Sequence, residues 1–110
     1  MKNWYFLNGS WLQEDEVKIT AHDIAFLRGL AVFDFLRTYN REPFTLTEHV
    51  ERLFNSAKLL GLPLPASPSY FTPSGVEEVV REGIQKNPHL SDLYIKLYFT
   101  GTFEFECLKQ

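Results

Sequence analysis

The sequence predicts an α+β fold, a two-layer sandwich in which two helices cover one face of a mainly antiparallel sheet. Three observations support this prediction. The first part of the chain contains short segments rich in β-branched and aromatic residues, separated by turn signals. Two segments with the apolar spacing of amphipathic helices follow. The chain then returns to a strand pattern, and this order is typical of a sheet with its helices on one side.

A first β-hairpin is expected at the N-terminus. Asn8-Gly9 favours the positive φ angles of a type I′ turn, and it lies between two short apolar runs, 4–7 and 11–12. Val17–Thr20 resembles a further short strand, whereas 21–30 has no clear pattern.

A second hairpin is expected around residue 40. Val32–Tyr39 is dense in β-branched and aromatic residues, which favour strands. The turn-forming sequence Asn40-Arg41-Glu42-Pro43 follows it. The next short apolar run, Phe44–Leu46, is expected to be the second strand of this hairpin.

Two amphipathic helices are expected next. The first starts at Thr47, which is its expected cap, and ends at Gly61. After a proline-rich loop, 63–73, the second helix begins at Ser74, where Ser74 and Glu77 have the spacing of a capping box. It ends before Asn87-Pro88. Its expected buried side chains are Val76, Val79, Val80 and Ile84.

The last expected strand is Leu93–Thr100, whose two faces differ in polarity. One face is apolar and is expected to join the core, and the other is more polar. The expected core face consists of Leu93, Ile95, Leu97 and Phe99, and the other face of Tyr94, Lys96, Tyr98 and Thr100.

The composition excludes several classes of function. A chain of 110 residues suits one domain and is short for two, so residues 1–110 are expected to form a single domain. The net charge of -3 offers no excess of positive charge for nucleic acid. Cys107 is the single cysteine, and no metal site is expected. No apolar run approaches the ~20 residues of a membrane span or forms a signal peptide, so we expect a cytoplasmic protein without a membrane partner.

One residue is a candidate binding group from its position alone. Arg52 falls in the first turn of the first expected helix, shortly after His49, where several backbone N–H groups lack partners within the helix. A guanidinium at this place favours an anion. The same pattern is also typical of a solvated helix residue, with His49 as a capping or surface residue.

Several runs of the sequence occur together at fixed gaps. They are 23–37, 43–46 and 48–53, followed by Ser56-Ala57. This combination resembles the class IV aminotransferases, a family that includes D-amino-acid and branched-chain aminotransferases and aminodeoxychorismate lyase. The opening hairpin and the strand 94–101 also have counterparts in the family. The resemblance therefore covers nearly the whole chain and implies the small N-terminal domain of that fold.

The resemblance implies roles for individual residues. Arg52 matches the arginine that contacts the phosphate of pyridoxal 5'-phosphate, which agrees with a cationic fork at a helix start. Phe33 matches an aromatic position on the substrate side of the cofactor, although a Phe in a strand usually packs in the core. Arg28 and Lys96 are cations that can meet a substrate carboxylate, although both residue types are mostly exposed. Arg37 shares the face of Phe33 at period two.

The sequence also departs from the family pattern. The family's Asp-Arg-Gly reads Asp23-Ile24-Ala25 here, its Gly-Asp-Gly reads Gly29-Leu30-Ala31, and its glutamate after the aromatic position is Asp34. These changes make the loop more apolar. They imply a diverged subgroup with a substrate pocket unlike that of the best-known members.

The family's chemistry also needs a lysine that holds the cofactor and a partner for the pyridinium nitrogen. In the family both belong to the larger C-terminal domain, whereas this sequence ends at Gln110. We therefore expect a domain without the catalytic half, with no catalytic residue of its own, inactive alone and binding pyridoxal 5'-phosphate weakly or not at all. In a full-length parent, the expected reaction is amino-group transfer between an amino acid and a 2-oxo acid, or the related lyase reaction.

Other interpretations stay open beside this one. An isolated domain exposes the apolar surface that faced its partner, so we expect a homo-oligomer, a dimer in the first instance. The chain is alternatively a non-catalytic module for anion binding or dimerisation. A hydrolase that uses His22-Asp23 or His49 is disfavoured, because no Ser or Cys lies in the context of an activated nucleophile.

Overall fold

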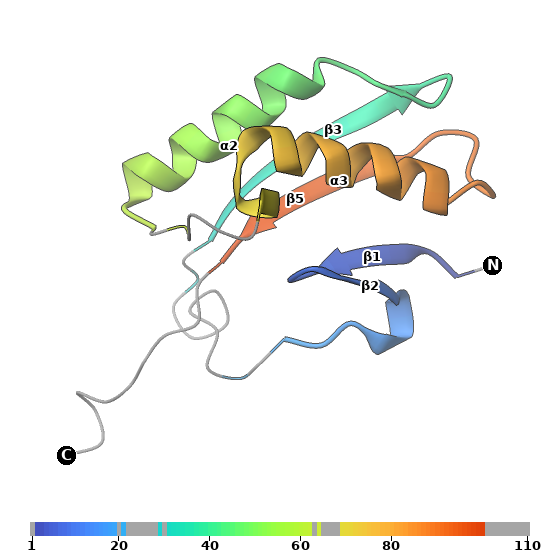
Figure 1. The fold of residues 1–110 in the computed structure, drawn as a ribbon, viewed down its shortest axis with the longest axis horizontal. Coiled ribbons are helices and arrows are strands. Elements are labelled where there is room, and N and C mark those ends of the chain that lie inside the picture. The colour runs from blue at the N-terminus through green and yellow to red at the C-terminus, as the bar shows by residue number, and fades with distance from the viewer. Residues whose placement is uncertain are drawn as a thin grey trace.

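The structure is a computed structural model that describes residues 2–19, 21, 29, 31–62, 64 and 69–100. In chain order, its elements are β1 (Trp4–Leu7), β2 (Ser10–Gln13), the 3-10 helix η1 (Glu14–Glu16), β3 (Val32–Tyr39), β4 (Glu42–Pro43), α2 (Leu46–Leu60), the 3-10 helix η2 (Ser69–Phe71), α3 (Pro73–Lys86) and β5 (Tyr94–Phe99). The strands form two antiparallel sheets, β1–β2 and β4–β3–β5. Figure 1 shows α2 and α3 on the same side of β3 and β5, which confirms the predicted α+β class.

The first hairpin forms where the sequence predicts it. Asn8 and Gly9 have φ angles of 49° and 92°, as a type I′ turn requires. A Cβ atom on Gly9 would lie 3.1 Å from the Tyr70 ring, so this glycine is needed for close packing as well as for the turn. The strand expected at 17–20 is wrong for 17–19, which have no sheet partner and follow η1. Thr20 lies outside the described residues.

The second hairpin is tighter than predicted. Asn40 and Arg41 form its turn, with φ angles of 50° and 65°, so Glu42 already lies opposite Tyr39. The second strand is therefore Glu42–Pro43, and the expectation of a strand at 44–46 is wrong. Thr45 instead turns the chain into α2 with a φ of 51°.

The helices end where predicted but begin earlier. Thr45 precedes α2 as its N-cap residue without a side-chain cap, so Thr47 is not the cap that the sequence suggests. Thr72 caps α3, because its Oγ1 accepts a hydrogen bond from the Gly75 N–H at 3.1 Å. Pro73 is then the first residue of α3, and Ser74 lies within the helix. Gly61 ends α2 with a φ of 78°, as predicted.

The core lies between the helices and one face of the three-stranded sheet. Leu36, Val50 and Val80 meet there, with contributions from both helices and from β3. The predicted core face of β5 packs against this cluster through Leu93, Ile95, Leu97 and Phe99. Val76 and Ile84 are buried as predicted, whereas Val79 is only half-buried. No helix in the described part of the chain is both long and apolar enough to cross a membrane.

Arg41 joins the hairpin turn to the end of α3. Its guanidinium donates to the backbone oxygens of Ile84, Leu90 and Asn87. The last carbonyl groups of a helix lack partners within that helix, and the bond from Arg41 to the Ile84 oxygen supplies a donor to one of them in α3. The Asp92 carboxylate completes the junction, since it accepts from the Arg41 backbone N–H at 2.9 Å. The arginine therefore orders the junction between α3 and β5.

Arg41→Lys tests this junction. A lysine keeps the charge, but its single ammonium cannot reach three carbonyl groups as the planar guanidinium does. We expect the free energy of unfolding to fall by about 1–3 kcal/mol, measured by urea denaturation. Arg81→Lys is the matched control, because Arg81 is exposed on α3. Equal effects of the two substitutions would show that the Arg41 bonds do not stabilise the fold.

Candidate functional site

A buried carboxylate lies on the core-facing side of β3. Alternation along the strand places Asp34 between Val32 and Leu36 on the face that packs against the helices. Asp34 is only 5% exposed. A buried charge is costly unless it has partners of opposite charge or hydrogen-bond donors, so this residue needs specific neighbours.

Two residues of α2 supply those neighbours. Arg52 donates from Nε to Asp34 Oδ2 at 2.7 Å and from Nη2 to Oδ1 at 2.9 Å. The His49 Nδ1 atom lies 2.6 Å from the same Oδ1 atom. His49 and Arg52 are three residues apart and therefore share one face of the helix. The arrangement is a bidentate ion pair with a histidine at its inner side, and we call these three residues the carboxylate cluster.

The charges of the carboxylate cluster follow from this geometry. The pKa of Asp34 is lowered to about 2, chiefly by the hydrogen bonds from Arg52 and with a further contribution from His49. Burial acts in the opposite direction but is outweighed. The pKa of the Arg52 guanidinium is raised by its bonds to Asp34. Both groups are therefore charged at neutral pH.

The outer side of Arg52 faces solvent. Its side chain is 65% exposed although two of its nitrogen atoms are held by Asp34. The third nitrogen, Nη1, makes no hydrogen bond with another residue in the described part of the chain. Because five N–H donors are available on a guanidinium, this arrangement leaves donors free for an anion that approaches from outside.

The position of Arg52 in its helix differs from the prediction. Since α2 begins at Leu46, Arg52 lies in the second turn, not in the first. The free backbone N–H groups of the helix start are about one turn away from it. Any affinity of this place for an anion therefore depends on the guanidinium itself.

The opposite face of the three-stranded sheet is aromatic and exposed. Cross-strand pairing brings Phe33 beside Tyr98 and Phe35 beside Lys96. Two ring pairs stack on this face, with centroid distances of 5.6 Å for Phe33 and Tyr98 and 5.7 Å for Phe35 and Tyr94. We call this surface the aromatic face; it consists of Phe33, Phe35, Arg37, Tyr39, Phe44, Tyr94, Lys96 and Tyr98.

Three of the predicted site residues lie on the aromatic face. Phe33 is 59% exposed, so it does not pack in the core as an ordinary strand phenylalanine would. Arg37 lies over the Tyr39 ring, with its Cζ atom 4.2 Å from the ring centroid. Lys96 is exposed opposite Phe35 on β5. Arg28 lies outside the described residues.

The structure thus separates the predicted residues into two groups. Arg52 reaches β3 from the helix side at Asp34, whereas Phe33 points from the neighbouring position of the same strand to the other side. The two groups are close along β3 but occupy different faces of the sheet. A ligand that contacts both must therefore extend around one edge of the sheet.

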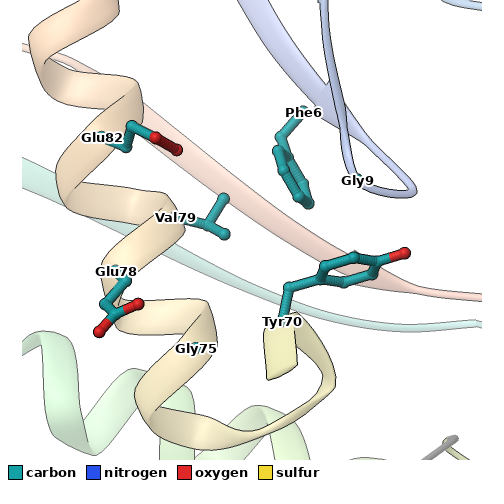
Figure 2. A pocket seen from close by; sticks show the side chains of 7 residues that line it. All are labelled: Phe6, Gly9, Tyr70, Gly75, Glu78, Val79 and Glu82. Carbon is teal, nitrogen blue, oxygen red and sulfur yellow. The ribbon is translucent and has the colours of Figure 1, made fainter. Parts of the chain in front are cut away.

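A separate hollow lies between the first hairpin and α3. Figure 2 shows Val79 pointing from α3 toward the hairpin, where Phe6 and Tyr70 lie beside each other, with the carboxylates of Glu78 and Glu82 along the helix. The Trp11 indole N–H donates to the Glu82 carboxylate at 3.0 Å. This packing explains why Val79 is half-buried against the hairpin and not buried in the core. None of the predicted site residues lines this hollow.

Two members of the carboxylate cluster were not among the predicted site residues. In the sequence, Asp34 is only a departure from the family pattern, and His49 has the pattern of a capping or surface residue. The signal was present, because period-two alternation already places Asp34 on an apolar strand face, where a charge needs a partner. No group of three or more histidine, cysteine, aspartate or glutamate residues with metal-binding geometry occurs among the described residues.

Comparisons with known proteins agree with the fold and with the resemblance in sequence. The family model "Amino-transferase class IV" matches residues 31–105. A putative branched-chain-amino-acid aminotransferase of Methanocaldococcus jannaschii is 36% identical over 95 residues, which are 86% of this chain and 31% of that protein. A D-alanine aminotransferase of Staphylococcus aureus is 39% identical over 59 residues, which are 54% of this chain and 21% of that protein.

Solved structures give the same result in three dimensions. The branched-chain aminotransferase of Thermoproteus uzoniensis, solved with norvaline, has a TM-score of 0.80 and 29% identity over 94% of this chain and 34% of its own. The T.th. branched-chain amino acid aminotransferase, solved with N-(5'-phosphopyridoxyl)-L-glutamate, has a TM-score of 0.76 and 30% identity over 89% of this chain and 32% of its own. The same enzyme has also been solved with pyridoxamine 5'-phosphate.

This chain spans about a third of the length of the aminotransferases that it matches over most of its sequence. The matched residues 31–105 are well over half of the chain and include β3, the whole carboxylate cluster and the whole aromatic face. The agreement in family pattern, sequence and fold confirms the predicted resemblance, and the chain belongs to the class IV aminotransferase family.

Proposed function

We propose that this chain is the N-terminal domain, residues 1–110, of a cytoplasmic aminotransferase that transfers an amino group between an amino acid and a 2-oxo acid with pyridoxal 5'-phosphate. The observation that carries the proposal is the carboxylate cluster. Its Arg52 guanidinium is held on one side by Asp34 and exposed on the other. Such a guanidinium suits the phosphate of the cofactor, because a planar fork matches phosphate oxygens.

The aromatic face supports the second part of the proposal, a substrate wall. Phe33 offers an exposed ring, and Lys96 and Arg37 are cations that stand among aromatic side chains. A cation beside apolar rings suits a substrate that has a carboxylate and an apolar side chain. We also propose that Arg28 binds the substrate carboxylate, because of its place in the family pattern. The diverged residues 23–25 and 29–31 give this proposed pocket a more apolar loop than that of the best-known family members.

The cofactor, when bound, acts as an electron sink that weakens bonds at the substrate's α-carbon. In the proposal, this chain contributes binding and orientation: Arg52 holds the phosphate, while Phe33 and Lys96 orient the substrate. The lysine that attaches the cofactor comes from another domain, so the chain alone is inactive. In this proposal Lys96 binds a carboxylate and does not attach the cofactor.

One observation favours an additional binding role for the sheet. Tyr94 is 72% exposed and Tyr98 is 55% exposed, and both belong to a continuous aromatic face. Continuous apolar patches of this kind are typical of interaction surfaces. We propose that a second copy of the chain covers this face when the catalytic domain is not present, which makes the isolated chain a homodimer.

Arg52→Ala tests the phosphate role. We expect the affinity of the chain for pyridoxal 5'-phosphate to fall about tenfold or more, because the main charge-assisted bonds to the phosphate are lost. Changes of amide chemical shift during titration measure the affinity. The matched control is Arg81→Ala, which removes an exposed arginine elsewhere. If the two variants bind equally well, Arg52 is not the phosphate ligand.

Chemical trapping tests the expected inactivity of the chain. Borohydride reduction makes any bond between a lysine and pyridoxal 5'-phosphate stable to mass spectrometry. We expect only scattered, substoichiometric labelling of the lysines, which are Lys2, Lys18, Lys58, Lys86, Lys96 and Lys109. A stoichiometric adduct at one of them, above all at Lys96, would mean that this chain has cofactor chemistry of its own.

Sedimentation equilibrium tests the homodimer. We expect Tyr98→Lys to weaken the self-association of the chain at least about tenfold, because it replaces an exposed ring with a third cation on the aromatic face, beside Arg37 and Lys96. Leu59→Lys is the control, since Leu59 is an exposed apolar residue of α2. A wild-type chain that stays monomeric at high concentration would contradict the dimer.

A further inference from the structure

We propose that Asp34 is a positioning residue that holds the Arg52 guanidinium in one orientation for a phosphate group, and that it also fixes the tautomer of His49. This inference rests on the proposed function, since it assumes that Arg52 is the phosphate ligand. It goes beyond that function because Asp34 itself does not touch the ligand.

The first step is the geometry of the ion pair. Two parallel bonds, from Nε at 2.7 Å and from Nη2 at 2.9 Å, fix both the position and the plane of the Arg52 guanidinium. An exposed arginine otherwise samples many rotamers, and a ligand that binds it must order them. Because Asp34 orders the group in advance, the ligand meets the free Nη1 edge already in place.

The second step concerns the charge of Asp34, whose effect on the affinity for an anion is opposite to the effect of holding Arg52 in place. A carboxylate beside Arg52 neutralises much of its charge and repels an anion. When the carboxylate charge is removed, the loss of positioning weakens the affinity for phosphate, whereas the relief of repulsion strengthens it. Asp34 is 5% exposed and points at the inner side of the guanidinium, away from the exposed edge. We therefore expect positioning to outweigh repulsion.

The third step is the proton on His49. Asp34 is ionised at neutral pH, so both of its oxygens only accept hydrogen bonds. At 2.6 Å from Oδ1, the Nδ1 atom of His49 must carry the proton. The Arg52 Nη2 atom, 3.1 Å from the same Nδ1, is then a neighbour and not a hydrogen-bond donor to it. Neutral His49 is thereby held as the Nδ1–H tautomer, with its lone pair on Nε2.

The test uses the 110-residue chain with ¹⁵N labelling and pyridoxal 5'-phosphate as the probe. We expect Asp34→Asn to weaken the affinity at least about fivefold, although it makes the chain more positive by one charge. Asp34→Glu keeps the carboxylate and is expected to restore most of the affinity. Asp15→Asn is the charge-matched control, because it removes an exposed carboxylate that pairs with Lys2. It is expected to leave the affinity unchanged.

A double-substitution cycle shows whether Asp34 acts through Arg52. In an Arg52→Lys background the bidentate pair is already lost, so adding Asp34→Asn is expected not to weaken the affinity further; because only repulsion then remains, the affinity stays equal or becomes slightly tighter. An equal or tighter affinity of Asp34→Asn than of the wild type would overturn the proposal. If Asp34→Asn does not fold, the affinity of the Arg52→Lys variant for pyridoxal 5'-phosphate is the test. The exposed lysine keeps the charge of Arg52 but is not held in one orientation by Asp34, so we expect weaker binding. Wild-type affinity in this variant would overturn the proposal as well.

The signals of the cluster side chains distinguish a failure of this inference from a failure of the proposed function. A wild-type Arg52 Nε–Hε resonance that does not respond to the probe means that Arg52 is not the phosphate ligand, and both then fail. A resonance that responds equally well in Asp34→Asn removes the positioning role alone. Imidazole ¹⁵N shifts are expected to show the Nδ1–H tautomer in the wild type and a mixture in Asp34→Asn. An Nε2–H tautomer in the wild type would contradict the geometry.

Discussion

The division of β3 into two unlike faces is the constraint on which the rest of the structure depends. Val32, Asp34, Leu36 and Thr38 point to the helices, and the alternate residues of the strand belong to the aromatic face. A shift of the strand register by one residue would expose the core side chains and bury Phe33 and Arg37. The strand pairs with β4 on one side and with β5 on the other, so its register sets the positions of both.

The Asp34–Arg52 pair links this strand to α2. A buried ion pair is a weak source of net stability, because the desolvation of Asp34 offsets much of the attraction, and here one partner is largely exposed. The structural effect of the pair is to restrict how α2 is oriented on the sheet. The apolar contacts of Val50 and Leu53 hold α2 against the sheet but do not define its rotation as narrowly as two directional bonds do. The pair therefore selects one arrangement of the helix on the strand.

Local signals account for the parts of the fold that were predicted well. The Asn8-Gly9 turn, the strand 32–39, the end of α2 at Gly61 and the two faces of β5 follow from backbone preferences and apolar period. The errors occur where neighbouring signals compete. Thr45 and Thr72 act at the helix starts in place of Thr47 and Ser74, since Leu46, which was expected to lie in a strand, begins the buried stripe of α2, and Pro73 is the first residue of α3. The candidate site was predictable only in part. Alternation along the strand places Asp34 on the apolar face, but its partners His49 and Arg52 arise from a contact between β3 and α2, which no spacing within one element reveals.

The protonation states of the carboxylate cluster limit how it can respond to pH. The folded pKa of Asp34, about 2, lies below that of a free carboxyl, and the pKa of Arg52 is raised above its ordinary value. The ion pair is therefore complete above about pH 5 and is lost only as the pH falls toward 2. A phosphate monoester loses its second proton near pH ~6, where neither group titrates. The orientation of the Arg52 guanidinium is therefore kept constant across the pH range in which the phosphate changes its charge.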